Sequence, residues 1–136
     1  MTQKTKMWVF ACVGLPGLML MTAGCGNNEE TSAAGAPDYW LTDFDRAKQV
    51  ARQQGKDLLI NFSGSDWCYW CKKLDKEVFS KASFYEQAED RYVFVLIDFP
   101  QDTAGQSADV QQQNRQLAQR FDIQGFPTVL LTDADG

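Results

Sequence analysis

The sequence predicts an α/β domain in which helices and strands alternate along the chain. Two apolar runs, at residues 58–62 and 92–99, are short and continuous, which is typical of strands buried on both faces. The segments around them carry apolar residues at helical spacing instead. The resulting order is helix, strand, helix, strand, helix, strand. This alternation indicates crossover connections between the strands of one sheet.

The first helix is expected between Thr42 and Gly55. Thr42 followed by Asp45 fits a capping box, which gives hydrogen-bond partners to the first free N–H groups of a helix. The apolar stripe that follows consists of Phe44, Ala47, Val50 and Ala51. Gly55 then ends the helix, and the strand over residues 58–62 follows at once.

Helical patterns also lie between the two apolar runs. Cys71, Leu74 and Val78 are spaced i, i+3, i+7, which places them on one face of a helix. Ser83 followed by Glu86 fits a second capping box, so another helix start is expected there.

The last helix and strand are expected after residue 109. The helical face there consists of Val110, Asn114, Leu117, Ala118 and Phe121. A Gly-Phe-Pro sequence at residues 125–127 stops the helix, and the chain returns to a strand from Thr128 to Thr132.

The composition excludes several classes of function. The 136 residues have a net charge of −5 and an isoelectric point near 4.6, which argues against a nucleic-acid binder because phosphate contacts need a basic face. The chain contains no histidine, so it has no Ser-His or Cys-His nucleophile and no His-ligated zinc. A c-type haem site would need histidine where the chain has Lys72. Chemistry by cysteine, carboxylate or backbone groups remains.

Residues 1–24 have the layout of a secretory signal. Lys4 and Lys6 precede an uncharged stretch that ends in small residues before Cys25. This ending resembles a bacterial lipobox, in which the cysteine receives lipid and becomes the mature N-terminus. Residues 25–38 are small and polar, which predicts a flexible linker before a domain at 39–136. Cleavage at an ordinary signal-peptidase site and an uncleaved membrane anchor are the alternatives.

The candidate redox site is the pair Cys68 and Cys71, between the end of a predicted strand and the start of a helix. Free backbone N–H groups and the helix macrodipole stabilise an anion at such a position. We therefore expect Cys68 to be the nucleophile, with its thiol pKa lowered from about 8.5 into the range of about 3.5–7.5. Cys71, one turn later, is expected to resolve the mixed disulfide that Cys68 forms with a substrate.

Structural explanations of the same residues stay open. A disulfide between Cys68 and Cys71 would close a loop of only four residues, worth about 2 kcal/mol in the chain-entropy model. A zinc site would need two more ligands, which only another molecule could supply. Trp67 and Trp70 are either core aromatics or side chains that shape what approaches the thiols.

The run from Tyr39 to Gly136 resembles the thioredoxin superfamily. The sequences NFSGSDWCYWCKKLDKEVF and GFPTVLLTDADG are most similar to the C-terminal thioredoxin-like domain of DsbD-type transmembrane reductases and to small exported thioredoxin-like lipoproteins. The resemblance implies a central mixed sheet flanked by helices. It also implies that Pro127 is a cis proline facing the cysteines, with the backbone of Phe126 offered to an extended substrate. The substrate contacts we assign are Trp67, Tyr69, Trp70, Phe126 and Pro127. A proline that merely starts a strand is the alternative for Pro127.

The sequence departs from the thioredoxin pattern in three places. Asn61 stands near the strand position where thioredoxins keep a buried acid, so the proton acceptor for Cys71 is unassigned. Tyr69 and Trp70 replace the Gly-Pro of thioredoxin, which leaves the redox direction open. The chain ends on a turn signal at residues 132–136, where the family continues with a strand and a helix. We therefore expect a C-terminally truncated domain, because a bare edge strand favours aggregation.

Together these features predict an extracytoplasmic thiol-disulfide oxidoreductase, tethered to a membrane through lipid on Cys25 and facing the periplasm or the cell exterior. By resemblance it is a protein disulfide reductase that exchanges disulfides with protein thiols and takes electrons from a redox partner at the membrane. No cofactor, metal or nucleic-acid partner is implied. The alternatives are a non-catalytic thioredoxin-like binding module or holdase, which would pair a partner strand with the Phe126 edge, and a disulfide isomerase.

Overall fold

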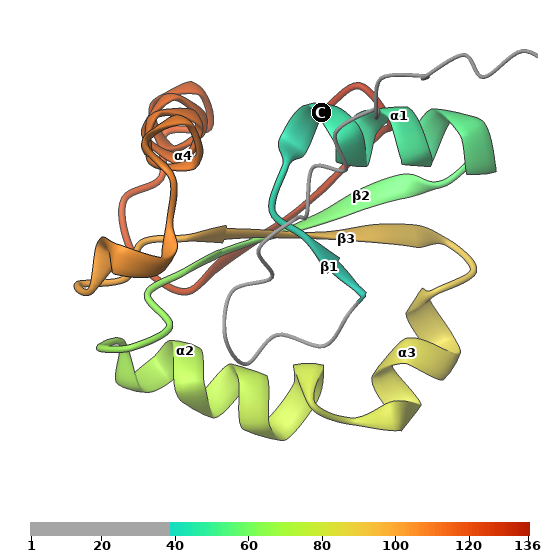
Figure 1. Cartoon of the computed structure of the whole chain (residues 1–136). Helices are drawn as coiled ribbons and strands as arrows, with labels where there is room; N and C mark the ends of the chain where they lie inside the picture. Colours follow the sequence, from blue (N-terminus) through green and yellow to red (C-terminus); the bar gives the residue numbers. More distant parts are fainter. Residues whose placement is uncertain (1–38) are drawn as a thin grey trace, which may run out of the picture.

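A four-stranded mixed sheet with the strand order β1-β3-β2-β4 forms the centre of the fold (Figure 1). The computed structural model describes residues 39–136. The strands are β1 (Trp40–Leu41), β2 (Asp57–Ser63), β3 (Tyr92–Asp98) and β4 (Thr128–Thr132). β1 and β2 both run parallel to β3, whereas β4 runs antiparallel to β2. The predicted α/β class and mixed sheet are confirmed.

Helices cover both faces of this sheet (Figure 1). They are α1 (Phe44–Gln54), α2 (Tyr69–Leu74), the π-helix η1 (Asp75–Phe79), α3 (Ala82–Ala88), the 3₁₀ turn η2 (Thr103–Gly105) and α4 (Ala108–Arg120). α1 and α4 lie on one face, and α2 with α3 lies on the other. None of these helices in residues 39–136 is long and apolar enough to cross a membrane. The predicted signal at 1–24, the linker at 25–38 and the lipidation of Cys25 fall outside the described residues.

The two central strands supply both halves of the core, because successive side chains of a strand point to opposite faces. One cluster packs beneath α1 and α4, and its strand residues are Leu58, Ile60, Phe62, Val93, Val95 and Ile97. The other packs against η1 and α3 and consists of Trp40, Leu59, Phe79, Tyr85 and Phe94. The continuous apolar runs therefore do mark strands covered on both faces.

Two capping predictions from the sequence are wrong, and one short strand was missed. The N-cap of α1 is Asp43, whose side chain accepts a hydrogen bond from the Arg46 N–H at 2.9 Å, and not Thr42. α3 begins at Ala82 after Lys81, whose side chain makes no capping bond, so the predicted Ser83 capping box does not form. β1 precedes α1 and was missed, because two residues are too short to show an alternating pattern.

The helix that follows Cys71 also departs from its predicted face. Cys71 is buried as expected, but Val78 is exposed and Phe79 is buried in its place. The reason is η1, because a π turn accommodates one extra residue and rotates the side chains that follow. The buried residue on this helix is therefore at i+8 relative to Cys71, and not at the predicted i+7.

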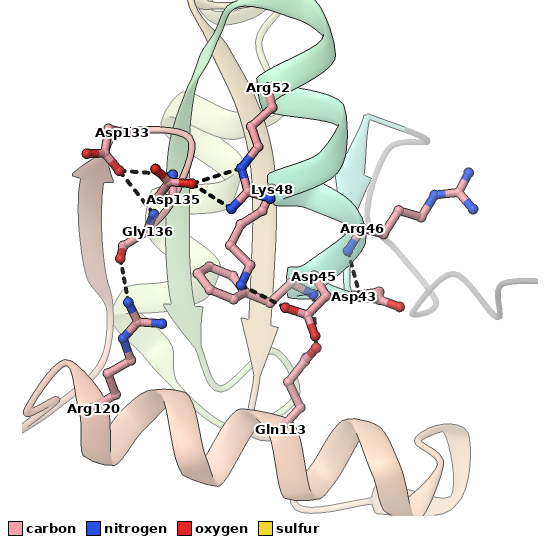
Figure 2. Close-up of polar contacts among 11 residues, drawn as sticks. Asp43, Asp45, Arg46, Lys48, Arg52, Gln113, Arg120, Asp133, Asp135 and Gly136 are labelled. Atoms are coloured by element: carbon pink, nitrogen blue, oxygen red, sulfur yellow. Dashed lines mark hydrogen bonds and ion pairs between the residues drawn. The ribbon is translucent and has the colours of Figure 1, made fainter.

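Polar contacts join α1 and α4 to the residues that follow β4 (Figure 2). Arg52 of α1 donates from Nε to Oδ1 of Asp135 at 2.8 Å, and Arg120 of α4 donates from Nη2 to the carbonyl of Gly136 at 2.6 Å. Gln113 of α4 accepts from the Phe44 N–H and donates to the Thr42 carbonyl, both at 2.9 Å. These contacts tie α4 and the residues after β4 to the α1 side of the sheet.

β4 lies at the edge of the described sheet. Among residues 39–136 it pairs with β2 alone, and Val129 and Leu131 on this strand are exposed. The expectation of a further strand and helix concerns residues outside this sequence and stays a prediction.

Candidate active site

Cys68 and Cys71 form a disulfide at the start of α2, with their Cα atoms 5.3 Å apart. Cys68 is the N-cap residue of α2, and its Sγ accepts a hydrogen bond from the Cys71 N–H at 3.2 Å. The helix start predicted for the motif is therefore observed. In this oxidised form both cysteines are buried, with exposed fractions of 6% for Cys68 and 5% for Cys71. In the reduced protein we expect Cys68 to be the more accessible thiol, which stays a prediction.

The loop before Cys68 starts where β2 ends. The Cys68 N–H donates to the Gly64 carbonyl at 2.8 Å, which turns the chain from the strand into α2. The Trp67 indole lies over Gly64, and a Cβ on residue 64 would come within 2.5 Å of Trp67 Cε2. The indole fits there because Gly64 has no side chain. A glycine at this position is therefore a packing requirement.

Trp67 and Phe126 pack together beside the cysteines. Their ring centroids lie 6.0 Å apart, and Phe99 packs on Phe126 with a centroid distance of 5.2 Å. The Trp67 indole donates from Nε1 to the Phe99 carbonyl at 2.8 Å. Trp67 is nevertheless 44% exposed, so it is not a core aromatic. We call Trp67, Phe99 and Phe126 the aromatic wall.

Tyr69 and Trp70 form a separate ring pair between the two cysteines. Their centroids are 5.1 Å apart, and the side chains are 68% and 62% exposed. The Lys73 ammonium lies 5.7 Å from the centroid of the Trp70 ring. Both aromatic rings therefore face solvent on the first turn of α2, where they add little to the core.

Pro127 follows the aromatic wall directly. The Phe126–Pro127 peptide bond is cis, as the family resemblance implied, and Pro127 precedes the first residue of β4. The contact between Phe126 and Trp67 brings this segment to the loop that carries Cys68. The structure thus brings Phe126 to Trp67 in the Cys68 loop, although the two residues lie far apart in the sequence, and the expected position of Pro127 facing the cysteines stays a prediction.

Asp98 ties the Cys68 loop to the end of β3. Its buried carboxylate accepts hydrogen bonds from both the backbone N–H and the hydroxyl of Ser65. The Asp98 carbonyl accepts from Gln106 at 3.1 Å and from Asn114 at 2.8 Å. β2 and β3 are parallel, so the residues that follow them emerge at the same edge of the sheet.

Asp66 makes a second link between these segments. Its carboxylate accepts hydrogen bonds from the Gln101 N–H at 2.9 Å and from the Asp102 N–H at 2.9 Å. These backbone donors, that of Asp102 first, hold the pKa of Asp66 below its ordinary value because they stabilise the ionised carboxylate. The Lys72 ammonium donates to the Asp66 carbonyl at 2.6 Å.

Asn61 is buried in the middle of β2, where it pairs with Leu96 and Val129 on the neighbouring strands. Its Oδ1 has no hydrogen-bond partner among the described residues. The structure thus confirms that Asn61, and not an acid, occupies this buried position in β2. The proton acceptor for Cys71 thus stays unassigned.

Phe99, Asp98 and the role of Asp66 were not predicted from the sequence. For Asp98, one signal in the sequence was available. A charged residue ends the buried run of β3, and parallel strands end at the same edge of a sheet, so Asp98 was due to lie near the residues that follow β2. Within residues 39–136, no group of three or more His, Cys, Asp or Glu side chains could hold a metal ion.

Residues 44–136 match a protein family described as a thioredoxin-like domain. The chain belongs to this family. Over 140 residues it is 29% identical to the disulfide bond reductase DsbH of Chlamydia pneumoniae, covering 96% of this chain and 83% of that protein. A solved structure titled DsbH oxidoreductase has 28% identity and a TM-score of 0.66, covering 82% of this chain and 78% of that one.

The thiol:disulfide interchange protein DsbD of Cronobacter sakazakii is also similar, with 35% identity over 96 residues. That alignment covers 71% of this chain but only 15% of DsbD, so the likeness concerns one part of a much longer protein. With the Cys68–Cys71 disulfide present, the chain is a member of the thiol-disulfide oxidoreductases in the thioredoxin-like family.

Proposed function

We propose that this protein is an extracytoplasmic protein disulfide reductase. The observation that carries the proposal is the Cys68–Cys71 disulfide at the start of α2 in a thioredoxin-like fold, and the cis Phe126–Pro127 bond supports it. The similarity to a protein named disulfide bond reductase supports the direction of the reaction.

The reaction needs only the two cysteines and the substrate. In the reduced protein, the Cys68 thiolate attacks one sulfur of a substrate disulfide and releases the other sulfur as a thiolate, which takes up a proton. Cys71 then loses its proton and attacks Cys68 Sγ, which frees the second substrate thiol and forms the Cys68–Cys71 disulfide. The substrate gains two electrons from the protein and two protons, one lost by Cys71 and one taken from solvent, to which Cys68 had lost its proton when it became a thiolate.

The helix start favours Cys68 as the attacking thiol. Cys68 is the N-cap residue, and the Cys71 N–H already donates to its sulfur, so a thiolate there would be stabilised by the backbone. Trp67, Tyr69 and Trp70 would contact the substrate around Cys68. The backbone of Phe126, before Pro127, would pair with an extended substrate segment.

Cysteine substitutions test the proposed roles. Cys68→Ser should abolish reduction of insulin disulfides, whereas Cys71→Ser should trap mixed disulfides with protein substrates. In the reduced protein, iodoacetamide at slightly acid pH should label Cys68 faster than Cys71. Undiminished turnover by Cys68→Ser would favour a binding module, and faster labelling of Cys71 would reverse the two roles.

The reduction potential tests the direction. A value near about −270 mV, as for thioredoxin, supports a reductase, whereas a value near about −120 mV indicates an oxidant. The measurement is an equilibrium with glutathione or dithiothreitol at several ratios of the reduced to the oxidised form.

The cellular setting is part of the proposal and depends on the sequence. Residues 1–24 would direct export, Cys25 would carry lipid, and residues 25–38 would link the lipid to the domain that begins at residue 39. A membrane redox partner would return electrons to the pair. Mass spectrometry of the mature N-terminus tests the anchor: an unmodified Cys25, or a chain that starts beyond it, rejects lipidation while leaving the redox proposal intact.

A further inference from the structure

The three residues before Cys68 are each bonded to the last residue of β3 or to the segment that follows it. Ser65 donates twice to Asp98, the Asp66 carboxylate accepts from the Gln101 and Asp102 N–H groups, and the Trp67 indole donates to the Phe99 carbonyl. The two segments are more than 30 residues apart in sequence. Residues 99–102 therefore form part of the surroundings of Cys68, although they belong to neither the cysteine motif nor the proline loop.

One of these bonds, from the Trp67 indole to the Phe99 carbonyl, joins two members of the aromatic wall. Phe99 packs on Phe126, and Phe126 packs on Trp67, so the three rings come from three different segments. Trp67 immediately precedes Cys68, which makes the wall continuous with the proposed reaction site. The bonds to Asp66 hold the backbone only two and three residues beyond Phe99.

Asp66 has no other evident task in the fold. Its side chain is exposed and lies outside both apolar clusters. Asp98, by contrast, is buried, and its carbonyl also accepts hydrogen bonds from Gln106 and Asn114, so its loss would disturb the fold more widely. Asp66 is thus the residue at which this link can be tested with the smaller disturbance of the fold.

We propose that Asp66 is a positioning residue for exchange with protein substrates, acting through Phe99. Its carboxylate holds residues 101–102 so that the aromatic wall stands beside Cys68 and receives an apolar side chain of the substrate segment that carries the disulfide. This role rests on the proposed reductase function. A small aromatic disulfide reaches Cys68 without using the wall, so its reduction does not depend on Asp66.

The test compares two disulfide substrates in the full-length protein. For insulin, Asp66→Ala is expected to raise KM and to lower kcat/KM about tenfold, equivalent to about 1.4 kcal/mol. For dithionitrobenzoate, the rate should stay within about twofold of the parent protein, because this small disulfide reaches Cys68 without using the aromatic wall. Asp90→Ala is the matched control, because Asp90 is an exposed carboxylate at the opposite end of β3.

Two further variants separate hydrogen bonding from charge and from folding. Asp66→Asn keeps an oxygen where Oδ2 now accepts from both Gln101 and Asp102, so it should restore most of the insulin activity. Phe99→Leu keeps the Asp66 link but removes the ring, and it should raise the KM for insulin as Asp66→Ala does. The double variant should be no worse than either single variant, because both act on one unit.

Several results would overturn the proposal. Unchanged insulin kinetics in Asp66→Ala would remove the role, as would an equal loss on both substrates, since Asp66 would then act on Cys68 itself. Equal effects of Asn and Ala at residue 66 would assign the effect to charge, and additive losses in the double variant would separate Asp66 from Phe99. If the parent protein does not reduce insulin while dithionitrobenzoate still reacts, the proposed function fails first and this role fails with it.

Discussion

Asn61 and Asn114 are both buried, but their side-chain oxygens differ in hydrogen bonding. Replacing the two residues should therefore change the stability of the protein in opposite directions. Asn61 in β2 has a buried Oδ1 with no partner among the described residues. Asn114 in α4 is also buried, but its amide donates to the Asp98 carbonyl at 2.8 Å and its oxygen accepts from Gln113 at 3.1 Å. An unpaired buried polar group costs about 1–3 kcal/mol, and removing it returns that free energy.

We expect Asn61→Val to increase the free energy of unfolding by about 1–3 kcal/mol, since valine also suits a central strand and is similar in size. Asn114→Leu, with a residue suited to a helix, should decrease it by about the same amount because the bond to Asp98 is lost. In a domain of this size, each 1 kcal/mol corresponds to a shift of about 4–8 °C in Tm.

The assay is urea unfolding of the oxidised proteins followed by circular dichroism, with the slope against urea checked for equality between variants. A loss of more than about 1 kcal/mol in Asn61→Val, similar to that in Asn114→Leu, would refute the reasoning. It would mean that Asn61 makes a hydrogen bond in solution that the structure lacks.

Two other predictions concern the loop before Cys68. Gly64→Ala should displace the Trp67 indole, because the new Cβ would lie 2.5 Å from it, and insulin reduction should fall. Gly105→Ala is the control, because a Cβ there would have no neighbour within 4 Å. Normal activity in Gly64→Ala would contradict the packing argument. The lowered pKa of Asp66 stabilises the folded protein above about pH 3.9, its ordinary unfolded value, and this contribution is lost as the pH falls through the folded value. The stability difference between the parent protein and Asp66→Asn should therefore shrink in urea titrations from pH 6 to pH 2, and a constant difference would refute the link.

Local patterns determined which segments become strands and helices. The continuous apolar runs of β2 and β3 predicted strands that are buried on both faces. Gly55 ended α1 because glycine adopts the left-handed backbone conformation of this helix end at little cost. The C-x-x-C motif lies between a predicted strand and a helical pattern, which placed Cys68 at the start of a helix, where the first backbone N–H groups are free. These features depend on residues close together in sequence, so the sequence alone predicted them.

The tertiary structure decided the features that depend on contacts between distant segments. The π turn places Phe79 in the core in place of Val78, and no local spacing reveals it. Phe99 joins Trp67 and Phe126 only because β2 and β3 run parallel and end at one edge. The sequence by itself determined where the cysteines and the adjacent Asp66 and Trp67 lie. Only the fold brought Asp98, Phe99 and Phe126 to them, because contacts between residues more than 30 positions apart depend on the sheet that places both segments at one edge.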